Sequence, residues 1–511
     1  MISLKKSAKI IAIFLYFLLL VGVSGKLFFE QQFDAIKATF LSMRGSGDQT
    51  LAIGFSEPLL AFDPLVNDTG SRARLLHTYE ALIRVTSDLQ IESALAINYG
   101  SLDDFTWEFR LRPNVKFHNG QPLTVDDVIF SLSEARNNPR SGVKDLASTI
   151  SGIQKIDEEK FQIITDSPDP LLLQKLSFFL IFPKDFDVAN ASIPIGTGPY
   201  KLEKNEKGTI VLRLFDSYWG DKPVFEEVVL KTLTKREEKI TAMKNREVDI
   251  LANLPADIAN NFQYRGFELK TIPSLEVDFL MFHFDRTFKN RDLREAVRLA
   301  LDTANLSRLA QGFSVPATQF VGDGIFGFNP TISAPERNIS RAQELVSKVS
   351  RGQPIRATLD LPKGLEVFGE NVSLQLRRIG MEITPQFYEP NQLGKLVINR
   401  SSEFFFFGWR SELADASDFL TAVVHSPSGR FGQYNGGNYR STEADRLIEL
   451  SQETLKGEVR LEKLRSVMAK ITENDIIGIP LFSPEVLYGV SRKVEFKPRV
   501  DGYVLAQEVK L

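Results

Sequence analysis

A run of four phenylalanines, residues 404–407, is the feature that most constrains how this chain can fold. Aromatic side chains fit the pleated surface of a strand, and a run that is apolar on both faces is typical of a buried central strand. Gly408 and Trp409 follow directly, and three carboxylates come soon after them: Glu412, Asp415 and Asp418. Because ligands in α/β proteins bind at the carboxyl ends of strands, we expect a binding site here. The alternative is a core strand followed by a solvated acidic loop with a surface tryptophan.

Length and composition limit the class of protein. The chain has 511 residues, too many for a single hydrophobic core, so we expect two or three domains. A net charge of −3 and a pI of about 6.0 give no reason to expect nucleic acid as a partner. The sequence has no cysteine. This excludes disulfides, thiolate catalysis, zinc–thiolate sites and a lipid-modified N-terminal cysteine.

The N-terminus has the pattern of a secretion signal or of a membrane anchor. An apolar run over residues 10–25 is flanked by lysines: Lys5, Lys6, Lys9 and Lys26. A positive flank before an apolar core orients the rest of the chain outside the cytoplasm. The small residues 23–25 would suit a signal peptidase, so the sequence leaves cleavage open.

An apolar stripe favours the anchor over the cleaved signal. Phe29, Phe33, Ile36 and Phe40 are spaced four, three and four residues apart, which places them on one face of a helix. Such a stripe would have nothing to pack against if it began a mature chain, whereas it could lie on the bilayer beside an anchor. We therefore expect an anchor or signal over residues 1–26 and a juxtamembrane amphipathic helix with a linker over 27–48.

The body of the chain alternates between strand and helix patterns, which indicates an α/β fold. The expected strands lie at residues 51–55, 105–111, 210–214, 228–230, 248–251, 277–284 and 479–490, the last returning to an earlier sheet. The expected helices lie at residues 235–245, 291–301, 340–350 and 366–379, with others opened by Ser71, Thr124 and Thr442. Residues 313–330 are expected to form a long loop. Thr124 and Asp127 have the spacing of a capping box.

The glycine-rich turn at residues 196–200 is expected to be structural. Two glycines and a proline allow a sharp turn and a close approach of backbone to backbone. A phosphate-binding loop would need a lysine and a serine or threonine after the glycines, and neither follows.

No catalytic constellation is visible in the sequence. The four histidines, His77, His118, His283 and His425, are scattered without metal-ligand spacing. Neither the paired-histidine zinc motif nor the serine-nucleophile elbow occurs. The sequence therefore gives no support for an enzyme, a cofactor or a metal site.

Several sequence blocks, taken together and in this order, resemble the peptide/nickel family of ABC-transporter solute-binding proteins, family 5. The blocks are Tyr79–Leu82, Thr106–Arg112, Val115–Gly120, Thr124–Val128, Gly196–Tyr200, Tyr218–Gly220, Val248–Ile250, Leu293–Arg298 and Gly408–Trp409. They are spread over most of residues 50–490.

The resemblance implies a two-lobed α/β fold of the periplasmic-binding-protein type II, with an extra domain inserted in lobe one. The implied boundaries are 49–84, 191–271 and 480–511 for lobe one, 85–190 for the inserted domain and 272–479 for lobe two. The ligand would be enclosed between the lobes by hinge closure.

The resemblance also implies a ligand anchor near Gly408. In peptide-binding relatives, an aspartate four residues after this glycine pairs with the ligand's α-ammonium, and here that position is Glu412. The acid–proline pair that usually follows is Asp415–Ala416 in this chain. The implied ligand-binding residues are Gly408, Trp409, Arg410, Glu412, Asp415 and Asp418. The alternative is that Glu412 points to water or pairs with Arg410.

The function implied is a monomeric receptor that delivers peptides to ABC permease subunits in the membrane. The same fold could instead bind an oligosaccharide, an opine or a nickel complex, since fold alone does not decide the ligand. Nickel is disfavoured because no histidine lies near Gly408–Trp409. A membrane-anchored enzyme or scaffold is the alternative from another class.

Overall fold

The computed structural model describes residues 49–511, except residues 60 and 311. The expected anchor or signal at 1–26 and the expected helix and linker at 27–48 lie outside the described residues. Among the helices that are described, none is both long and apolar enough to cross a membrane.

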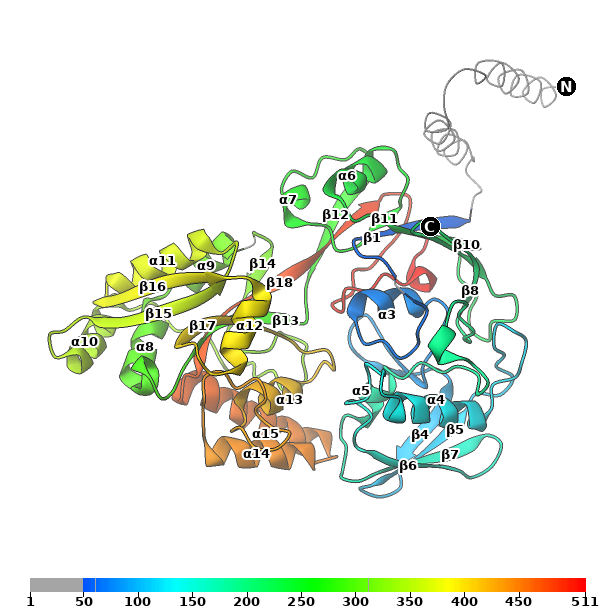
Figure 1. The fold of residues 1–511 in the computed structure, drawn as a ribbon, viewed down its shortest axis with the longest axis horizontal. Coiled ribbons are helices and arrows are strands. Elements are labelled where there is room, and N and C mark those ends of the chain that lie inside the picture. The colour runs from blue at the N-terminus through cyan, green and yellow to red at the C-terminus, as the bar shows by residue number, and fades with distance from the viewer. Residues whose placement is uncertain (1–48, 60, 311) are drawn as a thin grey trace, which may run out of the picture.

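One large mixed sheet runs through the described part of the chain (Figure 1). Its strands are β1 (Thr50–Phe55), β8 (Tyr200–Glu206), β9 (Thr209–Leu214), β10 (Glu227–Thr232), β11 (Ile250–Leu251), β12 (Phe267–Pro273), β13 (Glu276–Phe282), β14 (Ser314–Pro316), β15 (Ile355–Pro362), β16 (Met381–Tyr388), β17 (Phe404–Arg410) and β18 (Gly478–Ser491). The order is β16-β15-β17-β13-β18-β11-β1-β10-β9-β8, and β12 and β14 also pair with β18.

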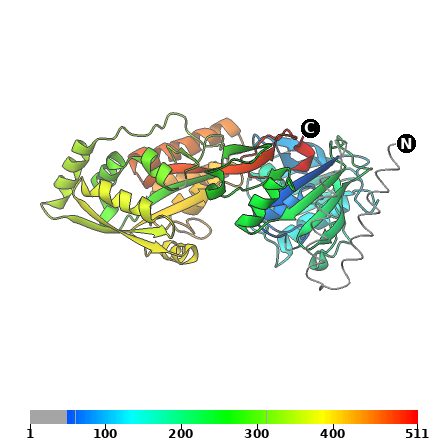
Figure 2. The same ribbon diagram turned by 90° about the horizontal axis from the view of Figure 1, so that it is seen from above.

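Strand β18 connects the two halves of the molecule. Its first residues pair with β13, and residues 485–491 pair with β12. The chain therefore passes between the halves at two places, the junction of β12 with β13 and the middle of β18. Figures 1 and 2 show the two halves as separate lobes joined by these strands. The expected two-lobed α/β fold is confirmed.

Strand β17 is the buried central strand expected from the four phenylalanines. It pairs antiparallel with β13 on one side and parallel with β15 on the other. Phe404 packs into the core formed with helices α8 (Arg291–Ala300), α9 (Thr303–Ala310), α10 (Ile339–Ser350) and α11 (Glu366–Arg377). Phe405 packs into the core formed with α12 (Pro390–Ile398), α13 (Ala416–Phe419), α14 (Thr442–Gln452) and α15 (Gly457–Ala469). Because both faces of the strand are covered by helices, both faces are apolar.

Lobe one contains two smaller sheets in addition to its share of the large one. An antiparallel sheet has the order β4-β5-β7-β6, from β4 (Ala96–Ser101), β5 (Thr106–Leu111), β6 (Ile150–Lys155) and β7 (Lys160–Thr165). Strands β2 (Ile83–Val85) and β3 (Ile91–Ser93) form a hairpin. The helices here are α3 (Thr69–Leu75), α4 (Val125–Asn137), α5 (Leu172–Leu176), α6 (Arg236–Lys244) and α7 (Ala256–Ala259).

Local sequence signals in lobe one are mostly confirmed. The capping box is present, since Asp127 Oδ2 accepts the backbone N–H of Thr124 at 2.8 Å. Gly196 passes so close to the backbone of Thr78 that a Cβ would clash with its carbonyl oxygen. The turn therefore locks one chain segment against another, as expected.

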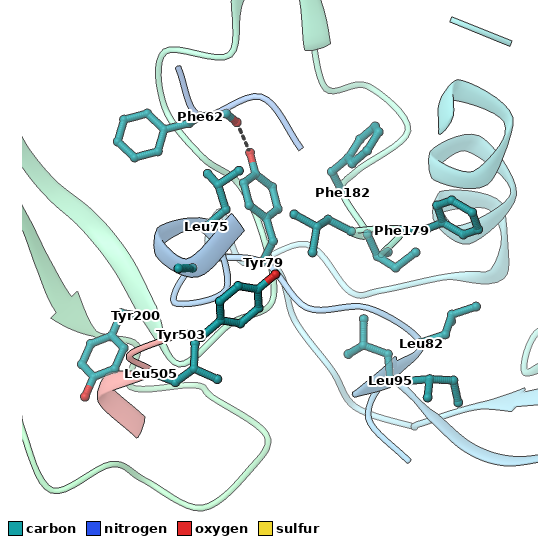
Figure 3. Close-up of a cluster of buried hydrophobic side chains, with 14 of the residues drawn as sticks. Phe62, Leu75, Tyr79, Leu82, Leu95, Phe179, Phe182, Tyr200, Tyr503 and Leu505 are labelled. Carbon is teal, nitrogen blue, oxygen red and sulfur yellow. Dashed lines mark hydrogen bonds between the residues drawn. The ribbon is translucent and has the colours of Figure 1, made fainter. Parts of the chain in front are cut away.

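The expectation for Ser71 was wrong. Helix α3 begins after Asp68, whose Oδ1 accepts the backbone N–H of Ser71 at 2.7 Å. The helix ends at Leu75, so Tyr79 lies beyond it. Tyr79 packs in the lobe-one core with Tyr503 and Leu505 from the C-terminal tail (Figure 3). The expected loop at 313–330 also contains a short strand, β14, at its start.

Candidate functional site

A cavity of about 590 Å³ is lined by residues of both lobes. Lobe one contributes residues around α3, from β2 and β3, from the loop 218–221 and from the tail 499–508. Lobe two contributes Leu275 at the junction of β12 with β13, and the loop 412–414 that follows β17. The carboxyl end of the central strand therefore reaches a cavity, and the binding site expected there stays a prediction.

The loop after β17 is held in a fixed conformation. The backbone N–H of Ser411 donates to the carbonyl of Leu275 at 3.0 Å. Ala414 has a φ of 55°, a conformation that disfavours residues other than glycine. The backbone N–H of Phe326 donates to the carbonyl of Ala414, and the carbonyl of Phe326 accepts the backbone N–H of Ala416. Such over-determined backbone is common where a chain presents side chains to a ligand.

Glu412 lies on the cavity wall and pairs with Arg410. Arg410 Nε donates to Glu412 Oε1 at 2.7 Å, and the hydroxyl of Thr69 approaches the same oxygen at 3.4 Å. Glu412 Oε2 has no partner among the described residues. The Glu412 side chain is 41% exposed, so this ion pair is partly open to solvent.

Arg410 also joins the two lobes. Its Nη2 donates at 2.8 Å to the carbonyl of Asp501, in the C-terminal tail of lobe one. Together with the contact between Thr69 and Glu412, this places two polar links between the lobes at the cavity.

Asp415 does not line the cavity. It is completely buried, and both of its oxygens pair with the guanidinium of Arg460 on α15, at 2.6 and 2.9 Å. Its Oδ1 also accepts the backbone N–H of Ser417 and so caps α13. Asp415 therefore ties the loop after β17 to two helices.

Trp409 and Asp418 form a second cluster, away from the cavity lining. Trp409 Nε1 donates to Asp418 Oδ1 at 3.3 Å, and the indole packs edge-on against Phe419 and Tyr434. Burial, helped by the charge of Asp415, raises the pKa of Asp418 to about 8. Asp418 is therefore largely protonated at neutral pH.

Gly408 lies against two acids on the neighbouring strand. A Cβ at this position would clash with the carboxyl groups of Asp278 and Glu276 on β13. Burial and the neighbouring Glu276 raise the pKa of Asp278 to about 8, and burial raises the pKa of Glu276 as well. The glycine thus leaves room for a buried pair of acids beside the junction of the lobes.

The lobe-one wall contains residues that sequence reasoning did not single out. Glu80 accepts hydrogen bonds from Trp219 Nε1 at 2.8 Å, Thr197 Oγ1 at 2.8 Å and Tyr218 OH at 3.1 Å. Burial raises the pKa of Glu80 to about 7. Arg112 stacks on the Trp219 ring at 4.0 Å. The only signal for these residues was their place in the sequence blocks quoted above.

Within the part of the chain that the structure describes, no group of three or more histidine, cysteine, aspartate or glutamate side chains could hold a metal ion.

Comparisons with known proteins agree with this architecture. Residues 90–431 match the family model of bacterial extracellular solute-binding proteins, family 5. The nickel-binding protein NikA of Staphylococcus aureus is 27% identical over 83% of this chain and 87% of its own length. The dipeptide-binding protein of Escherichia coli is 23% identical over 79% of this chain and 82% of its own length. The structure of HbpA2 from Haemophilus parasuis has a TM-score of 0.82 at 20% identity, covering 90% of this chain and 99% of that one.

Proposed function

This chain belongs to the bacterial extracellular solute-binding proteins of family 5, and on that premise we propose that it binds a peptide and delivers it to an ABC importer. Dipeptide-binding and oligopeptide-binding proteins are among its relatives. The chain would act as a monomer and would catalyse no reaction.

The observation that supports this proposal is the cavity lined by both lobes. A ligand held by residues of two lobes favours the arrangement in which both contact it. Only two strand segments join the lobes in the described chain, so a change in their φ and ψ angles would be enough for closure. Binding and closure would therefore be linked.

We propose that Glu412 binds the amino group of the ligand. Its pair with Arg410 is partly exposed, and pairs of this kind are weak. Both contacts of the side chain are to Oε1, so Oε2 can accept an ammonium while Arg410 stays in place. Trp409, Gly408 and Arg410 would shape and support this wall, and Asp415 and Asp418 would act from behind it.

We also propose the domain division expected from the sequence, with lobe one at 49–84, 191–271 and 480–511, the inserted domain at 85–190 and lobe two at 272–479. Residues 1–26 would anchor the chain in the cytoplasmic membrane, with the lobes on its outer side. Fractionation should then find the full-length chain with the inner membrane. A soluble product beginning at Lys26 would overturn the anchor.

Thermal unfolding with a ligand panel tests the function. We expect at least one peptide to raise the melting temperature as its concentration exceeds the dissociation constant. The same peptide should change the tryptophan fluorescence, since Trp219 lies in the cavity lining. Stabilisation by a nickel–histidine complex, an oligosaccharide or an opine alone would reassign the solute. If no member of the panel changes either signal, a hydrolysis screen would test the enzyme alternative.

A further inference from the structure

The acids that line the cavity are nearly all neutralised within the protein. Glu412 pairs with Arg410, while Asp501 and Glu508 both pair with Arg499 at 2.6 and 2.9 Å. Glu80 accepts hydrogen bonds from three side chains. Asp221 is the remaining acid of the lining, and it is exposed.

Two arginines on the lobe-one wall lack this compensation. Arg112 Nε donates to the carbonyl of Ala94 at 3.0 Å, and its guanidinium stacks on Trp219. Its two terminal nitrogens have no partner among the described residues. A half-buried guanidinium held flat by an aromatic ring is preorganised to bind a planar carboxylate.

Arg72 is the second arginine, and it is more deeply buried. It is 2% exposed, and its terminal nitrogens donate to the carbonyls of Phe178 and Ser177 at 2.9 and 3.2 Å. Its Nε is buried without a partner in the described chain. Gln507 Oε1, also in the cavity lining, is likewise buried and unpaired. Neither atom has accessible surface, so neither contacts a solute itself; Arg72 contributes the positive charge of its guanidinium to the cavity lining.

We propose that the lobe-one wall is a subsite for a carboxylate of the solute, bound by Arg112 and supported by the positive charge of Arg72. The solute would then be zwitterionic, with its amino group at Glu412 on lobe two and its carboxylate on lobe one. This inference rests on the proposed function for the identity of the solute, but not for the existence of the anion site.

The first test compares peptides that differ only in the carboxylate. Full-length chain in detergent is titrated by calorimetry with tri-alanine, with tri-alanine amide and with Ala-Glu-Ala amide. We expect tri-alanine to bind about 10- to 100-fold more tightly than its amide, as for a hydrogen-bonded charge pair. Recovery by Ala-Glu-Ala amide would assign the carboxylate to a side chain, and no recovery would assign it to the C-terminus.

Variants locate the effect. Arg112→Gln should remove the preference for the acid over the amide, and Arg112→Lys should restore part of it. Arg110→Gln is the matched control, because Arg110 lies two residues away and pairs with Glu159 on the outer surface. It should leave the preference unchanged. Equal binding of acid and amide by the wild type would overturn the subsite while leaving peptide binding intact.

The second test needs no peptide. In a Trp107→Phe, Trp409→Phe background, Trp219 is the single tryptophan of the chain. We expect iodide to quench it several-fold more strongly, relative to neutral acrylamide, than in the same background with Arg112→Gln. Identical ratios would overturn the anion site. If no peptide binds but the ratios differ, the proposed function falls and the anion site stands. A cavity that holds only water would show neither the preference for the acid over the amide nor the difference in quenching ratios.

Discussion

Glu412 and Asp415 are three residues apart, yet the structure gives them different partners and surroundings. Glu412 is 41% exposed on the cavity wall, and one of its carboxylate oxygens accepts no hydrogen bond from the described residues. Asp415 is fully buried, and both of its oxygens bind Arg460. Within the same loop, an acid that can bind a solute is followed by an acid that holds the loop in place.

Burial and pairing, rather than sequence position, therefore separate a binding acid from a structural one. A buried carboxylate with its own cation has little left to offer a ligand, whereas removing that cation is costly. An exposed, weakly paired carboxylate contributes little to stability but remains available. Changes at Glu412 should therefore act on binding, and changes around Asp415 on folding.

The largest expected effect is that of Arg460→Leu. It leaves Asp415 buried without a partner, which should cost about 3–5 kcal/mol in the free energy of unfolding measured in urea. The matched control is Arg341→Leu, since Arg341 pairs with Glu344 on the surface, and its cost should stay below about 1 kcal/mol. Similar losses in both variants would show that the buried pair contributes no more to stability than a surface pair does.

The next effect is on binding. Glu412→Gln should weaken binding of a peptide with a free amino group by about 2 kcal/mol, at the lower end for a charge pair because the site is partly open. The free energy of unfolding should change by no more than about 0.5 kcal/mol, as at ordinary surface positions. A variant that loses stability but binds normally would reverse the roles assigned to Glu412 and Asp415.

The pH dependence of stability should reveal Asp418. Its folded-state pKa of about 8 lies above the usual value near 4, so the folded chain binds one more proton across this window. Stability should therefore fall as pH rises through it, by up to about 1.4 kcal/mol per pH unit from this group. Asp278 and Glu80 should add to the slope in the same direction.

Asp418→Asn isolates that contribution. Urea unfolding at several pH values between 5 and 7 should give a flatter dependence for the variant than for the wild type. Parallel curves would mean that Asp418 is ionised in the folded protein.

The smallest expected effect concerns a hydrogen bond beside the buried pair. Arg460 Nη2 also donates to Ser417 Oγ at 3.0 Å. Ser417→Ala removes this bond but keeps Asp415 and Arg460 together, so it should cost about 1 kcal/mol of stability. A loss as large as that of Arg460→Leu would mean that the serine, not the ion pair, holds the loop.

Local patterns explain why parts of this fold could be predicted. The phenylalanine run determined a central strand because both of its faces had to be buried, and Thr124 with Asp127 identified a helix start. Helix α3 was misplaced because Asp68 and Ser71 are both good caps, and sequence alone does not rank them.

The roles of the acids depend on distant residues and could not be read locally. Asp415 meets Arg460 from 45 positions away, and Glu80 meets Trp219 from 139 positions away. The pair of Glu412 with Arg410 is the exception, because two residues so close in sequence made it an evident alternative.

The role proposed for Glu412 is to bind the amino group of a solute in the cavity between the lobes. Calorimetric titration of a free peptide and its N-acetylated form, into wild type and Glu412→Gln, tests it most directly. We expect acetylation to weaken binding by about 2 kcal/mol in the wild type but to cause almost no further loss in the variant, since both changes delete the same pair. Equal binding of the free and acetylated peptides by the wild type would contradict the claim.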